Sequence, residues 1–140
     1  MTPIVLATDG SEFSLKAARF LNDNKVVPAD GVVHVVHVAA QLTGRAAMYI
    51  DAEAVSQWQE AESNEAINPV LDLLQQMGIP AERKALTGNA ANEIPRYAEE
   101  VGAHLIVLGA HGRGRLANAL LGSVTNRVLQ RAHCSVLVVK

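Results

Sequence analysis

The sequence predicts an α/β fold in which helices cover both faces of a parallel sheet. Short apolar runs recur along the chain without the alternation of a half-exposed strand, as in strands that are buried on both faces. Stretches with apolar residues at helical spacing separate these runs. Strands that alternate with helices imply right-handed crossovers and a parallel sheet. The 140 residues suit a single domain, residues 1–140, and neither a repeat nor a linker divides them.

The first two strands and the helix between them are clearly marked. A strand over residues 4–8 ends at Asp9-Gly10, and Ser11 has the residue type of an N-cap for the helix that follows. The second strand, rich in β-branched residues, spans residues 32–40. We expect residues 41–53, which are mixed in character, to form a connecting loop.

The middle of the chain predicts one long helix that contains a proline. This helix runs from about Ala54 to Met77 and ends at Gly78. We expect Pro69 to kink or divide it, because proline lacks a backbone donor and crowds the preceding turn. A weak strand over residues 82–86 follows, and its charged residues are typical of a sheet edge.

Two further helices and two further strands complete the predicted fold. A helix over residues 91–101 precedes the apolar strand LIVLGA, residues 105–110. A final helix begins near Gly122-Ser123, and the last strand is SVLVV, residues 135–139. The predicted order is therefore β-α-β-α-β-α-β-α-β, with strands and helices in strict alternation.

A glycine-rich loop, GAHGRGRLANALLGS at residues 109–123, follows the fourth predicted strand. Gly109 and Gly112 permit close approach of the main chain to a ligand, and bared N–H groups form an anion-binding concavity. Gly122-Ser123 opens a helix, and a helix N-terminus accepts phosphate. Hydroxyls of Ser123 and Thr125 and the charges of Arg113 and Arg115 would add donors. The pattern indicates a phosphate-binding loop, with simple turn formation as the alternative.

The predicted loop shares an edge of the sheet with the turn Thr8-Asp9-Gly10-Ser11, where ligands bind in open parallel sheets. Asp9 could coordinate Mg²⁺ beside phosphates, although we favour a hydrogen bond to ribose or backbone. His111 could approach phosphate or ribose, or remain an exposed loop histidine. The loop is neither a Walker P-loop nor a Rossmann fingerprint, because the required lysine and second half are missing.

The remaining chemistry-bearing residues do not form a catalytic centre. His34 and His37 lie three apart on a strand, so they face opposite sides and cannot share a metal. Cys134 has no neighbour that would lower its pKa. Neither a Ser-His-Asp arrangement nor a zinc spacing occurs. The sequence therefore does not indicate a fast enzyme.

The amino-acid composition limits which binding partners and which cellular compartment we expect. A formal net charge of −2 favours neither nucleic acid nor an anionic membrane. The apolar runs stay well below the ~20 residues that span a bilayer, so we expect no membrane insertion. A single cysteine excludes an internal disulfide and fits a reducing compartment. We therefore expect a cytoplasmic globular domain.

The glycine spacing matches a known family. Gly109, two residues, Gly112, nine residues, and then Gly122-Ser123 reproduce the pattern of nucleotide-binding universal stress proteins of the single-domain type. IVLATDGSEFS and HVVHVAA resemble that family's first two strands, LIVLGAHGRG resembles the strand before its glycines, and CSVLVV resembles its last strand. The resemblance extends over the whole chain.

The resemblance implies a Rossmann-like three-layer sandwich whose five-stranded sheet has the order 3-2-1-4-5. It also implies a homodimer through residues 135–139, and an exposed apolar edge strand there would invite pairing. Members with this glycine pattern generally bind ATP. By resemblance, the residues that would hold the nucleotide are Ala7, Thr8, Asp9, Val38, Gly109, His111, Gly112, Arg113, Gly122, Ser123, Val124 and Thr125.

These observations favour an ATP-binding universal stress protein with a regulatory or stress-response role. The ligand would be ATP, or ADP or AMP, with or without Mg²⁺, and the output would pass to a regulatory protein partner that the sequence does not identify. Two alternatives stay open. One is a slow ATPase or nucleotidyl-transfer enzyme on the same scaffold. The other is a dimeric interaction module that binds no nucleotide.

Overall fold

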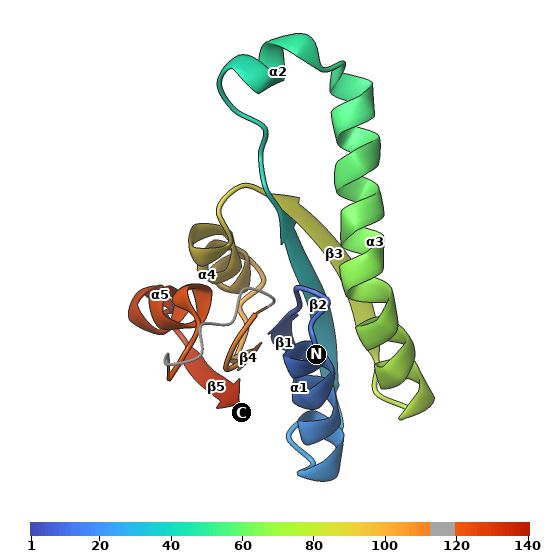
Figure 1. The fold of residues 1–140 in the computed structure, drawn as a ribbon. Coiled ribbons are helices and arrows are strands. Elements are labelled where there is room, and N and C mark those ends of the chain that lie inside the picture. The colour runs from blue at the N-terminus through green and yellow to red at the C-terminus, as the bar shows by residue number, and fades with distance from the viewer. Residues whose placement is uncertain (113–119) are drawn as a thin grey trace.

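The computed structural model describes residues 1–112 and 120–140, and five parallel strands form its sheet (Figure 1). The strand order is β3-β2-β1-β4-β5, which confirms the order that the resemblance implies. The strands are β1 (Thr2–Ala7), β2 (Gly31–Ala39), β3 (Ala81–Thr87), β4 (Leu105–Gly109) and β5 (Ser135–Val139). The direction of strand addition reverses between β1 and β4, and ligands bind at such a switch point.

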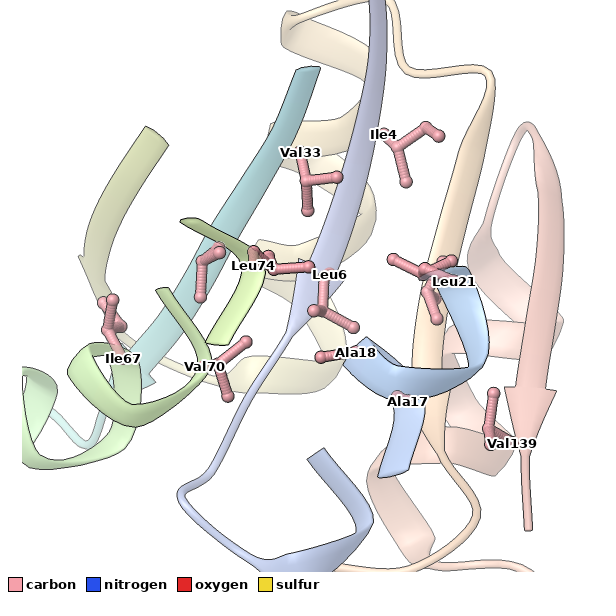
Figure 2. Packing of buried hydrophobic residues seen from close by; sticks show 12 residues of the cluster. Ile4, Leu6, Ala17, Ala18, Leu21, Val33, Ile67, Val70, Leu74 and Val139 are labelled. Carbon is pink, nitrogen blue, oxygen red and sulfur yellow. The ribbon is translucent and has the colours of Figure 1, made fainter. Parts of the chain in front are cut away.

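Helices cover both faces of this sheet, as the alternating pattern predicts. They are α1 (Glu12–Asp23), α2 (Arg45–Tyr49), α3 (Ala52–Gln76), α4 (Ala90–Glu100) and α5 (Ser123–Arg131). Successive residues of β1 point to opposite sides, so Leu6 packs with α1 and α3, whereas Val5 packs with α4 and α5. Figure 2 shows the first cluster, in which Leu6 lies among side chains from both helices.

The two histidines of β2 illustrate this alternation. His34 lies on the α4 side, where its Nδ1 is 2.9 Å from the hydroxyl of Tyr97. His37 lies on the α3 side, where its Nδ1 is 2.9 Å from Oγ of Ser63. The prediction that these histidines face opposite sides is confirmed, and each of them has a protein partner.

The structure differs from the sequence prediction at two places between β2 and β3. Residues 45–49, expected to lie in a loop, form the short helix α2, which follows Gly44 at a positive φ of 71°. Helix α3 continues without division through Pro69. The ring of Pro69 lies on the exposed side, so water can satisfy the carbonyl that loses its helical partner. Ile67 and Val70 beside it stay buried against the sheet and hold the helix together.

Most other element boundaries lie within two residues of the prediction, and β3 is at a sheet edge as its charges indicated. Helix α5 begins at Ser123 after Gly122, and β5 spans residues 135–139. Within the described part of the chain, every helix is too short or too polar to cross a membrane.

Candidate functional site

A cavity of about 410 Å³ opens at the carboxyl ends of β1, β2 and β4. Its position is the switch point of the sheet, where the sequence predicted a ligand site. The predicted residues that line it are Ala7, Thr8, Asp9, Val38, Gly109, His111, Gly112, Gly122, Ser123, Val124 and Thr125. Arg113 and Arg115 lie outside the described residues. The structure thus brings the described part of the predicted set into one cavity.

Sequence reasoning missed several residues of the wall. These are Ser14, Val36, His37, Ala90, Ile94, Leu108 and Leu121. Val36 and His37 are next to Val38 at the end of β2, so the carboxyl-end rule could have found them. Ala90 and Ile94 come from α4, and their contribution depends on the angle at which that helix packs. Together with Ala7 and Val38, the missed aliphatic residues form an apolar wall.

Thr8 fixes the turn between β1 and α1. Its buried hydroxyl donates to the carbonyl of Ala66 in α3 at 3.0 Å. The same oxygen accepts from the amide of Gly10 at 3.1 Å, and Gly10 adopts a φ of 82° that favours glycine. The side chain of Thr8 is therefore committed to the protein, and its contribution to the cavity is to shape the turn.

Asp9 is held by the first turn of α1. Its Oδ1 accepts from the amide of Ser11 at 2.9 Å and from Oγ of Ser14 at 3.2 Å. Ser11 occupies the N-cap position as predicted, but its own side chain makes no capping hydrogen bond among the described residues. These contacts agree with the preferred sequence interpretation, a hydrogen-bonding role for Asp9. Among residues 1–112 and 120–140, no three acidic, histidine or cysteine side chains are placed to hold one metal ion.

The start of the glycine loop packs tightly on α1. A β-carbon on Gly109 would lie 2.6 Å from Cβ of Phe13, so a residue without a side chain is required there. Downstream, the amide of Gly122 donates to the carbonyl of Ala110 at 2.7 Å, and the amide of Ala110 donates to Val139 at 2.8 Å. These bonds hold both ends of the loop beside the cavity.

Helix α5 points its N-terminus at the cavity. Gly122 has extended backbone angles at the N-cap, and Ser123, Val124 and Thr125 form the first turn. The amides of a first helical turn have no intrahelical acceptor, so they are available to an anion. Thr125 differs from the prediction in one respect: its buried hydroxyl donates to the carbonyl of Gly109 at 3.0 Å. That proton is therefore committed to the loop and not to a ligand.

His111 lies in the cavity wall and is half-buried, not an exposed loop residue. Its ring packs edge-on against Phe13 with the ring centroids 5.3 Å apart. Its Nδ1 is buried and has no hydrogen-bond partner among the described residues. Because an unpaired buried polar atom costs about 1–3 kcal/mol, this nitrogen is suited to a polar group of a ligand.

The lining of the cavity thus has two chemically distinct parts. One part consists of aliphatic side chains from β1, β2, β4 and α4, which suit a flat apolar group. The other part consists of loop backbone, the first turn of α5 and the side chains of Asp9 and His111. Such an arrangement can hold an organic anion whose apolar part enters first and whose charge remains at the glycine loop.

A comparison with protein families agrees with this geometry, because the model of the universal stress protein family matches residues 1–140. The chain belongs to the universal stress protein family. Universal stress protein MJ0531 of Methanocaldococcus jannaschii is 38% identical over 139 residues, which are 98% of this chain and 81% of that protein.

Solved structures show the same universal stress protein fold. The hypothetical protein MJ0577 has a TM-score of 0.84 and 28% identity, over 99% of this chain and 95% of that chain. A universal stress protein solved in complex with cAMP has a TM-score of 0.67 and 26% identity, over 99% of this chain and 95% of that one.

Proposed function

We propose that this universal stress protein binds an adenine nucleotide in the cavity at the switch point and acts as a cytoplasmic regulatory protein in the stress response. The observation that carries the proposal is the convergence of the apolar wall, the glycine loop and the N-terminus of α5 on one cavity. The complex of a related protein with cAMP supports the choice of an adenine nucleotide.

In this proposal the base lies against Val36, Val38 and Ile94, and the phosphates lie at the glycine loop. Burial of the apolar base contributes affinity, whereas main-chain amides near Gly112 and at Ser123 select for the negative charge. Of the adenine nucleotides, ATP has the most phosphate oxygens for these donors, and ADP or AMP would use part of the same set. A Mg²⁺ ion would enter with the phosphates, near Asp9.

The decisive experiment is mass spectrometry of the nucleotide that the purified protein releases on denaturation, followed by calorimetric titration with AMP, ADP and ATP with and without Mg²⁺. We expect an adenine nucleotide in the released fraction and saturable binding of at least one of the three. Bound ligand should also raise the melting temperature, because it binds only the native state. Absence of binding for all three would favour the interaction module that binds no nucleotide.

The same preparation tests for an enzyme. The proposal expects hydrolysis of ATP to be slow or absent, since positioned phosphates without a placed water or base give little acceleration. Multiple turnover that Asp9→Asn or His111→Gln abolishes while ATP still binds would favour the ATPase or nucleotidyl-transfer alternative.

The proposal includes a homodimer through β5 and a regulatory protein partner. Strand β5 lies at the edge of the sheet, opposite β3, and its sequence SVLVV is apolar. Only one side of an edge strand is paired within a sheet, so the other side can pair with a second chain. Sedimentation at micromolar concentration should give a dimer, and a monomer would contradict this part of the proposal.

A further inference from the structure

Helix α2 and the first half of α3 stand beyond the end of β2 as an arm, defined here as residues 45–62 (Figure 1). Large apolar side chains on this arm face solvent: Met48 is 80% exposed, Tyr49 84%, Ile50 46% and Trp58 52%. Helix α2 has no buried residue at all. Apolar side chains gathered on one projecting segment indicate an interaction surface, because single domains rarely leave such a group uncovered.

The base of the arm is fixed to the domain. The side-chain amide of Gln59 donates to the carbonyl of Ala40 at 3.1 Å. The guanidinium of Arg83 on β3 donates to Glu60 at 2.8 Å and also contacts Asn64. The arm is therefore held at its base, whereas no contact among the described residues buries the large apolar side chains of residues 48–50 at its tip.

The charged residues of the arm restrict the kind of partner surface that could cover its exposed apolar side chains. The arm carries four acidic residues and one basic residue, Arg45, and no further lysine or arginine occurs before Arg83. Asp51 and Glu53, next to the exposed apolar residues, are themselves exposed. A fitting partner surface is therefore apolar with a basic rim.

The chain itself presents such a surface along α5. Val124, Arg127 and Arg131 are spaced i, i+3 and i+7, so they share one exposed stripe of the helix. Leu120, which is 87% exposed, lies in the non-helical segment just before the N-cap Gly122 and adds a large apolar side chain near the start of α5. Residues 123–131 contain no acidic side chain. We define Leu120, Val124, Arg127 and Arg131 as the α5 surface.

The arm projects beyond the carboxyl end of β2, and α5 begins at the cavity that lies at the carboxyl ends of the strands, so both surfaces of one molecule can face the same partner. Helix α3 packs on the face of the sheet that α1 covers, and α5 packs on the other face. We propose that the arm of one copy docks on the α5 surface of a second copy, and that the arm of the second copy docks on the α5 surface of the first. We call this reciprocal docking the exchange. Apolar residues then meet apolar residues, Arg127 meets the acidic rim, and Trp58 and Tyr49 provide the aromatic anchors typical of interface cores.

This exchange goes beyond the proposed function and does not depend on it. A closed pair covers both surfaces in both copies, as a two-fold arrangement requires. Val124 also lines the nucleotide cavity, so a docked arm would lie at the cavity mouth of its partner. The pairing of β5 strands involves other residues, and the two contacts can be tested separately.

Disulfide trapping without nucleotide tests the exchange directly. Cys134 is the only cysteine, so Cys134→Ser gives a background without thiols. One chain then carries Tyr49→Cys and another carries Leu120→Cys. Under mild oxidation of the mixture we expect covalent heterodimers to form at least tenfold faster than in a matched mixture of Tyr49→Cys with Asn22→Cys, an exposed position at the end of α1.

Three results would overturn the proposal. Equal rates in the two mixtures would show random collision. A disulfide within one monomeric chain that carries both Tyr49→Cys and Leu120→Cys would show that the arm folds onto its own molecule. If most of the covalent product joins two Tyr49→Cys chains to each other, the arms contact one another and not the α5 surface. A β5-linked dimer in sedimentation would be compatible with each of these results, so the two proposals fail separately.

Charge reversal provides a second readout. Arg127→Glu in the Leu120→Cys chain should slow trapping about tenfold, whereas Arg19→Glu, on exposed α1, should not. Glu53→Arg in the Tyr49→Cys chain should restore the rate. Trp58 is the only tryptophan, so its emission should also shift to the blue as wild-type concentration rises. If Glu53→Arg does not restore the trapping rate and the Trp58 emission does not change with protein concentration, the exchange is contradicted.

Discussion

The carboxylate of Asp9 lies directly against the backbone of Gly112, so a β-carbon at position 112 would overlap Oδ2. The other oxygen of this carboxylate is held by the amide of Ser11 and the hydroxyl of Ser14. The carboxylate cannot turn away without breaking these bonds. The contact joins the turn after β1 to the loop after β4, and it shows why glycine is required at position 112 beyond any need of a ligand.

Gly112→Ala should therefore weaken nucleotide binding. The added methyl group has to displace either Asp9 or the loop, and overpacking of this kind costs about 1–3 kcal/mol. If the loop moves, the affinity for ATP should fall by about 5-fold to 150-fold. Isothermal titration of wild type and variant measures the change.

An Asp9→Ala background controls for this interpretation. Without the carboxylate, the methyl group of Gly112→Ala finds room, so the same substitution should cost clearly less affinity there. An equal loss of affinity in both backgrounds would show that the glycine serves the ligand and not the contact with Asp9.

Gly109→Ala should destabilise the fold itself. Its β-carbon would lie 2.6 Å from Cβ and 3.0 Å from the backbone carbon of Phe13, and backbone in a helix cannot yield easily. We expect the free energy of unfolding in urea to fall by about 1–3 kcal/mol. Gly122→Ser is the matched control, because among the described residues a β-carbon there meets nothing closer than 3.5 Å, and serine favours the N-cap. Similar stability of the two variants would contradict the close packing of α1 on β4.

Thr8→Val should lower the free energy of unfolding by about 1–3 kcal/mol. Valine has nearly the same shape but removes the hydrogen bond to the carbonyl of Ala66 and leaves the amide of Gly10 without its acceptor. Thr8→Ser keeps the hydroxyl and should retain most of the stability. Should both variants lose the same amount in urea denaturation, the methyl group and not the hydroxyl would carry the effect.

The sequence could predict the layers of the fold because each strand is marked by its own residues. Runs such as IVLA and LIVL have no polar face, so they require helices on both sides of a parallel sheet. The site followed from the rule that loops at the carboxyl ends of adjacent strands converge. This rule brought Asp9 and Gly112 together although about a hundred residues of chain separate them.

The structural features that the sequence did not predict depend on packing between elements, which no local sequence pattern encodes. Helix α2 buries nothing, so no apolar periodicity marked it. The sequence predicts that Pro69 kinks or divides α3; its outward position and the buried neighbours Ile67 and Val70 let the helix continue undivided. The hydroxyl of Thr125 was assigned to phosphate because of its place in the motif. Only the three-dimensional approach of α5 to β4 reveals the carbonyl of Gly109 as its acceptor.

The partly buried thiol of Cys134 should make the folded protein less stable at alkaline pH. Burial raises the pKa of its thiol, and hydrogen bonds to the backbone only partly oppose this effect. The folded state therefore keeps its proton at a pH where the unfolded chain has lost it, and the free energy of unfolding falls as pH rises above the unfolded pKa. Burial raises the pKa of Tyr97 as well, so both groups should contribute in the same direction.

Urea denaturation of wild type and Cys134→Ala over the interval ~1.5 units either side of the ordinary thiol pKa of about 8.5, which is about pH 7 to pH 10, isolates the contribution of the cysteine to this loss of stability. The variant should lose less stability over this interval, and Tyr97→Phe should reduce the remaining decline at its upper end. Alkylation by iodoacetamide should in parallel be slower for the native protein than for the urea-unfolded chain at the same pH, because only the thiolate reacts. Parallel stability curves for wild type and Cys134→Ala would mean that the thiol ionises as easily in the folded protein as in the unfolded one, and burial beside β5 would then not govern its chemistry.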